Sequence, residues 1–245
     1  MIFREYPDRG AAVFFDFDGT LVDLAAHPGA IRVEPEVPRL VAALAAALDG
    51  AVAVVSGRPL AELDRHLQPL VLCAAGVHGV ERRAGDGRLE QVAPPELAAA
   101  EALARSLQQR HPALGLERKP GALALHYRQA PELAELCLAT MTEAQRLAPG
   151  TALLHGKMVV ELKPAAADKG KAVERFLAEP PFVGRRPWFF GDDVTDESAF
   201  DVVQRAGGVA VKVGAGATVA QHRLSDPAAL RGWLAEAVDR LAVTP

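Results

Sequence analysis

The chain has 245 residues, half of them apolar, with a formal net charge of −4 and a pI near 6.0. This length and apolar content allow one large domain or two smaller ones around a sizeable core, and they exclude a disordered chain. The slight negative charge gives no general attraction to nucleic acid or to an anionic membrane surface. We therefore expect neither as a partner.

Two cysteines, Cys73 and Cys137, lie far apart in apolar sequence. They fit neither a disulfide framework nor a CxxC metal pair, so reduced core thiols are predicted. The first ten residues lack the apolar run of a signal peptide, and apolar runs such as Leu40 to Leu48 are too short to span a membrane. A soluble cytoplasmic protein is expected. The sequence leaves the oligomeric state open, with a monomer as the simpler expectation.

Apolar strands alternate with helical patterns at both ends of the chain, which predicts a mostly parallel sheet covered by helices, an α/β fold. The predicted strands are Ala11–Phe15, Ala51–Val55, Val71–Ala75, Pro187–Phe190 and Gly208–Val213. The predicted helices are Glu36–Leu48, Pro59–Leu67, Lys169–Leu177, Glu197–Arg205 and Ala228–Leu241.

The middle of the chain has a different order of elements. A turn at Asp86 and Gly87 is followed by a helix over 95–110, a strand over 122–128, a helix over 132–147 and a strand over 158–162. This order predicts a compact α+β insertion. The expected organisation is a core domain formed by residues 1–82 and 165–245, with an inserted domain at 83–164.

The first predicted strand ends in the run DFDGTL, which begins at Asp16. In an extended chain Asp16 and Asp18 point to the same side, while Gly19 and Thr20 turn the chain away. Two neighbouring carboxylates that face one space repel each other unless a cation or a reacting group shares that space. The run therefore predicts a polar site at the end of a buried strand.

Three further polar clusters follow predicted strands or begin predicted helices. Residues 56–58 (Ser-Gly-Arg) offer a hydroxyl and backbone amides to phosphate oxygens. Residues 191–197 (GDDVTDE) form a carboxylate cluster suited to a hard cation, and residues 168–170 (Asp-Lys-Gly) place a lysine at a helix start. Because the carboxyl ends of parallel strands line the ligand crevice of an open α/β sheet, all four clusters are expected to converge on one pocket.

Each of these three clusters has a simpler explanation when it is taken alone. Ser56 can belong to an ordinary strand-to-helix turn, and Asp168 can serve only as a helix cap with Lys169 in solvent. Asp192 or Thr195 can merely cap the following helix. Four such clusters in this order favour a single site over four unrelated turns.

In this order the four clusters resemble the motifs of the haloacid dehalogenase superfamily of phosphotransferases. Further segments are similar to the bacterial trehalose-6-phosphate phosphatase family, and the resemblance covers the chain from about Ala12 to Trp233. These segments are 76–81 (GVHGVE), 125–128 (LHYR), 156–161 (GKMVVE) and the GDDVTDE run. The resemblance implies a Rossmann-like parallel-sheet core with an inserted α+β cap domain. It also implies a phosphatase of trehalose biosynthesis that acts on trehalose 6-phosphate.

The resemblance assigns catalytic roles to four residues. Asp16 would attack phosphorus and form an aspartyl phosphate. Asp18 would protonate the departing sugar oxygen and then activate the water that hydrolyses the intermediate. Ser56 and Lys169 would bind the oxygens of the transferring phosphoryl group. Lys163 is an alternative for the phosphate-binding lysine, but Lys169 fits better because it precedes Gly170 at a helix start.

One magnesium ion is the cofactor that the resemblance implies. It would be held by Asp16, the backbone carbonyl of Asp18 and Asp192. Asp196 would act through water, and Asp193 is not assigned. Magnesium keeps several waters and needs few carboxylates, so this donor set is sufficient.

The resemblance also makes the inserted domain a cap that closes over the site and contacts the disaccharide. Polar side chains can hydrogen-bond a hydroxyl-rich ligand and are left unpaired when the wrong sugar binds. For each candidate, the alternative is an ordinary solvent-exposed side chain. The candidates are Lys119, His126, Arg128, Lys157 and Glu161, with Arg58 and His78 at the cap boundary.

Two alternatives remain open at this point. Fold and catalytic motifs do not fix the substrate, so a capped phosphatase for sucrose phosphate or for a glycerol-linked glycosyl phosphate is the nearest one. The other is a non-catalytic sugar-phosphate sensor with the same fold. The intact Asp16, Asp18, Lys169 and Asp192 argue against a sensor, because a binding module needs no nucleophile paired with an acid.

Overall fold

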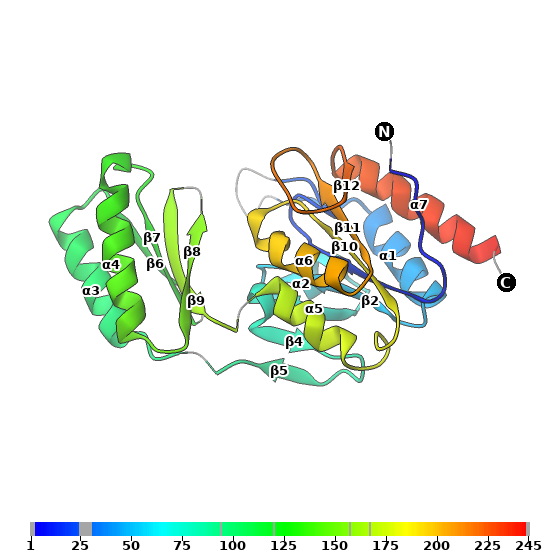
Figure 1. Ribbon diagram of the computed structural model, residues 1–245, viewed down its shortest axis with the longest axis horizontal. Coiled ribbons are helices and arrows are strands. Elements are labelled where there is room, and N and C mark those ends of the chain that lie inside the picture. Colours follow the sequence, from blue (N-terminus) through cyan, green and yellow to red (C-terminus); the bar gives the residue numbers. More distant parts are fainter. Residues whose placement is uncertain are drawn as a thin grey trace. The chain divides into compact units, whose positions relative to one another are not determined.

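The computed structural model describes residues 3–24, 31–93, 95–119, 121–156, 158–166 and 168–243. They form two compact units (Figure 1). The larger unit combines Met1–Gln91 with Asp168–Pro245, and the smaller one is Val92–Ala167. The chain therefore leaves the larger unit once and returns to it once.

Within the described residues, the larger unit contains an eight-stranded sheet in the order β12-β11-β10-β1-β2-β3-β4-β5. The strands from β12 to β3 are parallel, whereas β4 and β5 extend the sheet antiparallel. The predicted α/β class with a parallel sheet core is confirmed. The strands are β1 (Ala11–Phe15), β2 (Val52–Val55), β3 (Cys73–Gly76), β4 (Glu81–Arg83), β5 (Leu89–Gln91), β10 (Arg186–Gly191), β11 (Val209–Val213) and β12 (His222–Leu224).

Helices cover both faces of this sheet. Phe15 of β1 is in register with Phe190 of β10, so Phe14 points to the opposite face from Phe190. The ring of Phe14 lies 5.9 Å from that of Phe176 in α5, and the ring of Phe190 lies 4.5 Å from that of Trp233 in α7. Helix α6 packs beside α5, and α1 packs beside α7. The helices are α1 (Glu36–Ala47), α2 (Leu60–Leu67), α5 (Lys169–Leu177), α6 (Glu197–Arg205) and α7 (Pro227–Val243), with 3-10 helices η2 (Val77–Gly79) and η4 (Val194–Asp196).

A β-hairpin extends the large sheet beyond β3. Its turn spans residues 84–87 and includes the predicted Asp86 and Gly87, and Gly87 has a positive φ of 82°. The expected insertion begins at residue 83, but β4 and β5 belong to the larger sheet, so the chain leaves this unit only after Gln91. Arg82 of β4 is 3% exposed and pairs with Glu90 and Glu179, which ties the hairpin to the segment that follows α5.

In its described residues, the smaller unit contains a four-stranded antiparallel sheet in the order β6-β7-β9-β8, with two helices packed on it. Its separate core includes Leu107, Leu123, Met141 and Leu162. Strands β6 and β8 were not predicted, because their sequences are mostly exposed or half-exposed and lack a clear apolar alternation. The elements are α3 (Ala98–Arg110), β6 (Gly115–Lys119), β7 (Ala122–His126), η3 (Pro131–Leu133), α4 (Ala134–Leu147), β8 (Thr151–Gly156) and β9 (Val159–Pro164).

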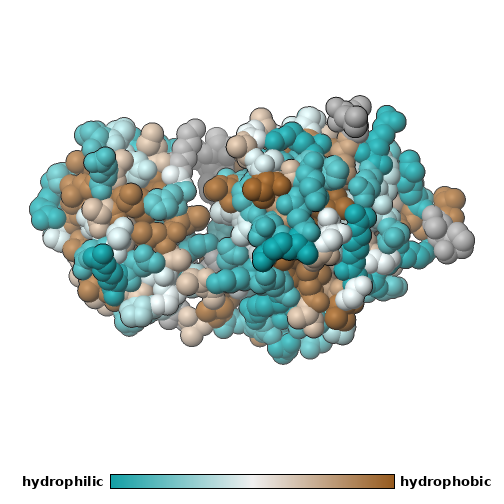
Figure 2. Space-filling model, in the orientation of Figure 1, coloured by the Kyte–Doolittle hydropathy of each residue, from teal (hydrophilic) through white to brown (hydrophobic). Residues whose placement is uncertain are grey.

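Both cysteines are free thiols, in agreement with the prediction. Cys137 is buried and Cys73 is half-buried, and burial raises the pKa of both thiols. In the part of the chain that the structure describes, no helix combines the length and the apolar character that a bilayer crossing requires. Hydrophilic side chains cover most of the face of the larger unit that is visible in Figure 2.

Phe14 provides a test of how the sheet packs on its helices. It is fully buried, with ring centroids 5.9 Å from Phe176 and 5.2 Å from Phe182. Phe14→Ala is expected to lower the free energy of unfolding by about 4 kcal/mol, because removal of the ring leaves a cavity in a close-packed layer. Urea denaturation measures the loss. Phe14→Leu keeps most of the apolar volume and should lose less than half as much, so equal losses would contradict packing as the cause.

Candidate active site

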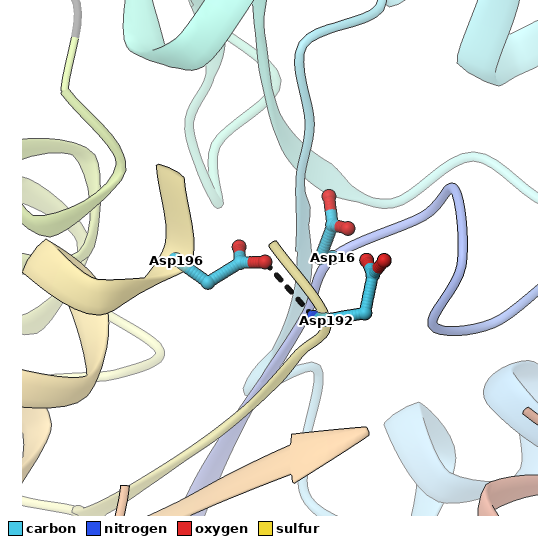
Figure 3. Close-up of side chains that lie close together, drawn as sticks. All are labelled: Asp16, Asp192 and Asp196. Carbon is cyan, nitrogen blue, oxygen red and sulfur yellow. Dashed lines mark hydrogen bonds between the residues drawn. The ribbon is translucent and has the colours of Figure 1, made fainter. Parts of the chain in front are cut away.

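Acidic side chains from two neighbouring strands and one 3-10 helix meet at one edge of the large sheet. Asp16 follows β1, and Asp192 follows β10, its parallel neighbour. Asp196 lies in η4, which follows Asp192 in the same GDDVTDE run. Carboxylate oxygens of the three residues all lie within 4.8 Å of one another (Figure 3). The structure therefore brings the DFDGTL and GDDVTDE runs together.

Lys169 joins two of these carboxylates. Its Nζ lies 2.6 Å from Oδ1 of Asp16 and 2.7 Å from Oδ1 of Asp196. The lysine side chain is only 3% exposed, so it is not the solvated residue of the simpler explanation. Asp168 does cap α5, because its carboxylate accepts a hydrogen bond from the backbone N of Lys171 at 3.0 Å. Residues 168–170 thus supply both a helix cap and a buried ammonium.

Burial raises the pKa of the clustered acids. It raises the pKa of Asp16 to about 7, with Asp192 adding to the shift and Lys169 opposing it. Burial and the charge of Asp16 raise the pKa of Asp196 to about 7, and burial also raises the pKa of Asp192. Although burial disfavours its charge, the carboxylates of Asp16 and Asp196 raise the pKa of Lys169. The cluster carries more negative charge than one ammonium balances.

This donor set fits a hard divalent cation, which prefers carboxylate oxygens and offsets their repulsion. Asp16 and Asp192 lie side by side in Figure 3 and would hold the ion. Both oxygens of Asp196 already accept hydrogen bonds, Oδ1 from Lys169 and Oδ2 from the backbone N of Asp192 and Asp193 at 3.0 and 2.9 Å. Asp196 therefore orients the lysine and the loop, while Asp193 is the N-cap of η4.

Gly19 and Thr20 shape the space in front of the acids. Gly19 has a φ of +79°, and a Cβ there would lie 2.2 Å from Oδ2 of Asp192, so only glycine fits. The Thr20 hydroxyl is buried and lies 3.4 Å from Oδ2 of Asp16 and 3.2 Å from Oδ1 of Asp192. The sequence pattern assigns Thr20 only to the turn. Its hydroxyl also holds the two carboxylates in place.

Asp18 is bound by Arg58. Arg58 Nε lies 2.7 Å from Asp18 Oδ2, and Nη2 lies 2.8 Å from Oδ1, which is a bidentate pair. The remaining nitrogen, Nη1, lies 3.0 Å from Oε2 of Glu62. The hydrogen bonds to Asp18 raise the pKa of Arg58. In this structure the guanidinium expected to contact a sugar therefore binds carboxylates.

Ser56 and His78 belong to one folded turn at the same edge of the sheet. Ser56 follows β2, the other neighbour of β1, and its Oγ accepts a hydrogen bond from the backbone N of Arg58 at 3.1 Å. His78 has a φ of 55°, and its backbone N donates to the Ser56 carbonyl at 2.8 Å. A Cβ on Gly57 would lie 2.8 Å from Cε1 of His78, so the imidazole packs on the turn. His78 thus supports the segment that carries Ser56.

Three of the sugar-binding candidates share one face of the small sheet. Strand register and alternation place Lys119, His126 and Glu161 opposite the face that packs on α3 and α4. Lys119 Nζ lies 2.8 Å from Oε2 of Glu161, and His126 Nε2 lies 2.9 Å from Oε2 of Glu117. The remaining candidates are Arg128, which follows β7 and is exposed, and Lys157, which lies outside the described residues.

Lys212 is a buried residue to which no sequence motif assigns a role. It is 4% exposed in β11, and its Nζ donates a hydrogen bond to the backbone carbonyl of Asp192. This contact fixes the backbone at the point where β10 ends. A lysine inside the apolar run VAVKV is the signal that points to it, because an isolated charge in a buried strand needs a partner.

Comparison with known proteins identifies the family. A family model described as trehalose-phosphatase matches residues 14–231. A trehalose-6-phosphate phosphatase of Escherichia coli K12 is 44% identical over 242 residues, which cover 94% of this chain and 88% of that protein. The chain belongs to the trehalose-phosphatase family. The prediction of a phosphatase of this family is confirmed.

Solved structures share the fold of this trehalose-phosphatase family member. The C-terminal domain of a trehalose-6-phosphate phosphatase from C. albicans has a TM-score of 0.78 at 21% identity, with 94% of this chain and 93% of that chain covered. A phosphatase of the haloalkanoate (HAD) enzyme superfamily from Bacteroides thetaiotaomicron has a TM-score of 0.63 at 14% identity, with 95% of both chains covered. The likeness confirms the predicted superfamily fold.

The raised pKa values of Asp16 and Asp196 predict that the metal-free protein loses stability as the pH rises. The folded protein keeps protons on these groups up to about pH 7, whereas the unfolded chain releases them near pH 4. Because the folded state binds more protons in this window, the free energy of unfolding should fall between about pH 4 and pH 7 and then level off. Urea denaturation in chelator at a series of pH values measures the slope.

Asp16→Asn is the matched control for this slope. The variant removes one acid with a raised pKa and also the charge that helps to raise the pKa of Asp196. Its stability should therefore depend less on pH. Magnesium added at alkaline pH should raise the melting temperature of the unmodified protein more than that of the variant. A flat profile in the unmodified protein would contradict the charge imbalance.

Proposed function

We propose that this chain hydrolyses trehalose 6-phosphate to trehalose and inorganic phosphate, with magnesium as cofactor and an aspartyl phosphate as intermediate. The family match over residues 14–231 and the 44% identity to a trehalose-6-phosphate phosphatase support the substrate. The chemistry is carried by one observation. Asp16 is buried and paired with Lys169 inside a carboxylate cluster that fits a cation.

The first half-reaction transfers the phosphoryl group to Asp16. An oxygen of the Asp16 carboxylate attacks phosphorus, an O–P bond forms, and the bond between phosphorus and the sugar oxygen breaks. Asp18 gives its proton to that sugar oxygen, so trehalose leaves as a neutral alcohol. Lys169 holds Oδ1 of Asp16, which orients the carboxylate and favours its ionised form.

Phosphoryl oxygens carry the charge that must be stabilised during transfer. Lys169 supplies a positive charge there, and Ser56 offers a hydroxyl at the end of β2. When bound, magnesium would offset the repulsion between Asp16 and the anionic phosphate. Asp16, the backbone carbonyl of Asp18 and Asp192 would hold it, while Asp196 orients Lys169.

The second half-reaction releases phosphate. Asp18, now ionised, takes a proton from a water molecule as that water attacks phosphorus, and the bond between phosphorus and Asp16 breaks. Asp16 is restored as a carboxylate, and Asp18 again carries the proton needed for the next sugar. The cycle therefore consumes only water besides the substrate.

We assign sugar recognition to the smaller unit, the cap domain that the family resemblance implies. Lys119, His126 and Glu161 share one face of its sheet. Arg128 and Lys157 complete the candidates. Lysine, arginine and glutamate side chains can bind the hydroxyls of a disaccharide, and a site built in this way rejects sugars that leave its polar groups unpaired.

A panel of sugar phosphates tests the substrate. Phosphate release should be fastest from trehalose 6-phosphate, with kcat/KM at least about 100-fold above that for sucrose phosphate or a glycerol-linked glycosyl phosphate, because unmatched hydroxyls leave polar groups of the site unpaired. The background phosphate release measured with the Asp16→Asn protein is subtracted from each rate. Faster turnover of another sugar phosphate would reject the proposed substrate, and binding without release from any of them would favour a sensor.

Asp16→Asn tests the covalent route. Turnover of trehalose 6-phosphate should fall by on the order of 10³ or more, because an amide cannot form the aspartyl phosphate. Steady-state phosphate release measures the change. Asp23→Asn is the control, since this carboxylate is exposed and pairs with Arg231. Near-normal turnover by folded Asp16→Asn protein would overturn the nucleophile assignment.

A further inference from the structure

The pair formed by Arg58 and Asp18 is not used in the chemistry described above. The two parallel hydrogen bonds of 2.7 and 2.8 Å join both oxygens of Asp18 to one guanidinium. The Arg58 side chain is 9% exposed, whereas that of Asp18 is 29% exposed. Arg58 is therefore the more deeply embedded member of the pair. Its position sets where the carboxylate of Asp18 lies.

Several contacts within the larger unit fix Arg58. Its Nη1 lies 3.0 Å from Glu62 in the first turn of α2, and its guanidinium carbon lies 5.8 Å from the centre of the Phe17 ring. Its backbone N donates to Oγ of Ser56 at 3.1 Å, and its carbonyl accepts from the N of Val77 at 2.9 Å. Main chain and side chain are thus both held.

The geometry of the pair matches the carboxylate form of Asp18. A guanidinium fork presents two N–H donors, and it matches a carboxylate that accepts at both oxygens. A proton on Asp18 would turn one of these oxygens into a donor that faces another donor. The pair is therefore strongest after Asp18 has given its proton to the sugar. An interaction that strengthens as a step proceeds accelerates that step.

We propose that Arg58, oriented by Glu62, is a positioning residue that acts through Asp18. It aims the carboxyl group at the leaving sugar and stabilises the carboxylate that forms when the sugar departs with the proton. The same contact keeps that carboxylate in place when water attacks the intermediate. This inference rests on the proposed function, in which Asp18 is the acid and the base.

The test compares two leaving groups. p-Nitrophenyl phosphate releases a stable anion that needs no proton, whereas trehalose 6-phosphate releases an alcohol that does. Arg58→Gln should lower kcat/KM for trehalose 6-phosphate by about 10- to 100-fold, the usual cost of losing a partner that orients an active-site group. The change for p-nitrophenyl phosphate should be within about 3-fold, since its leaving group does not depend on a general acid. Glu62→Gln should act in the same direction with a smaller effect.

A double-variant cycle separates action through Asp18 from direct contact with substrate. In an Asp18→Asn background, Arg58→Gln should change kcat/KM for trehalose 6-phosphate by less than about 2-fold, because the carboxylate on which it acts is gone. Arg58→Lys keeps the charge but not the fork, so its activity should be intermediate. Arg65→Gln is the control, because Arg65 is an exposed arginine in α2, the helix that carries Glu62, and melting temperatures are recorded for every variant.

Three outcomes would overturn the inference. Equal losses on both substrates at unchanged melting temperature would mean that Arg58 binds the phosphate directly. Parallel losses with a lower melting temperature would mean a structural role, and additive losses in the Asp18→Asn background would mean independent action. If Asp18→Asn itself fails to separate the two substrates, the acid role in the proposed function is wrong. If Asp18→Asn separates them and Arg58→Gln does not, only the inference about Arg58 fails.

Discussion

The ammonium of Lys169 between Asp16 and Asp196 is the interaction on which the site depends. It lies 2.6 and 2.7 Å from the two carboxylates, with all three side chains at most 5% exposed. Removing one partner from a buried ion pair leaves an uncompensated charge, which is strongly destabilising. The site is therefore built as a unit. Asp196 contributes by holding the lysine and the Asp192 backbone, which leaves Asp16 and Asp192 for the roles proposed above.

Each charged group in the site is oriented by a second group behind it. Lys212 holds the backbone of Asp192, and Arg58 holds Asp18. Such supporting contacts fix side-chain directions before substrate arrives, so less reorganisation is needed during the reaction. The arrangement explains why the larger unit contains buried lysine and arginine side chains at positions that would otherwise favour apolar residues.

Much of this fold could be predicted from the chain alone. The bounds of β1, α5 and α6 match the predictions, because a buried parallel strand is a continuous apolar run and these helices have clear starts. The hairpin strands β4 and β5 and the sheet-edge strands β6 and β8 were not predicted, since these short or largely polar segments carry no clear apolar period. Convergence of the motifs could be predicted from strand topology. The pairing of Asp18 with Arg58 and of Asp196 with Lys169 could not be predicted, because contacts between distant segments depend on packing that no local sequence pattern records.

The return of the chain to the larger unit at Asp168 has a consequence for exchanging domains. Asp168 caps α5, because its carboxylate accepts a hydrogen bond from the backbone N of Lys171, and the next residue, Lys169, binds Asp16, the proposed nucleophile. In a hybrid protein that carries the smaller unit of another family member, the junction must therefore lie before Asp168. A junction placed one residue later would remove the N-cap of α5 and displace Lys169. The hybrid would then lack the contact between Lys169 and Asp16, whatever insertion it carried.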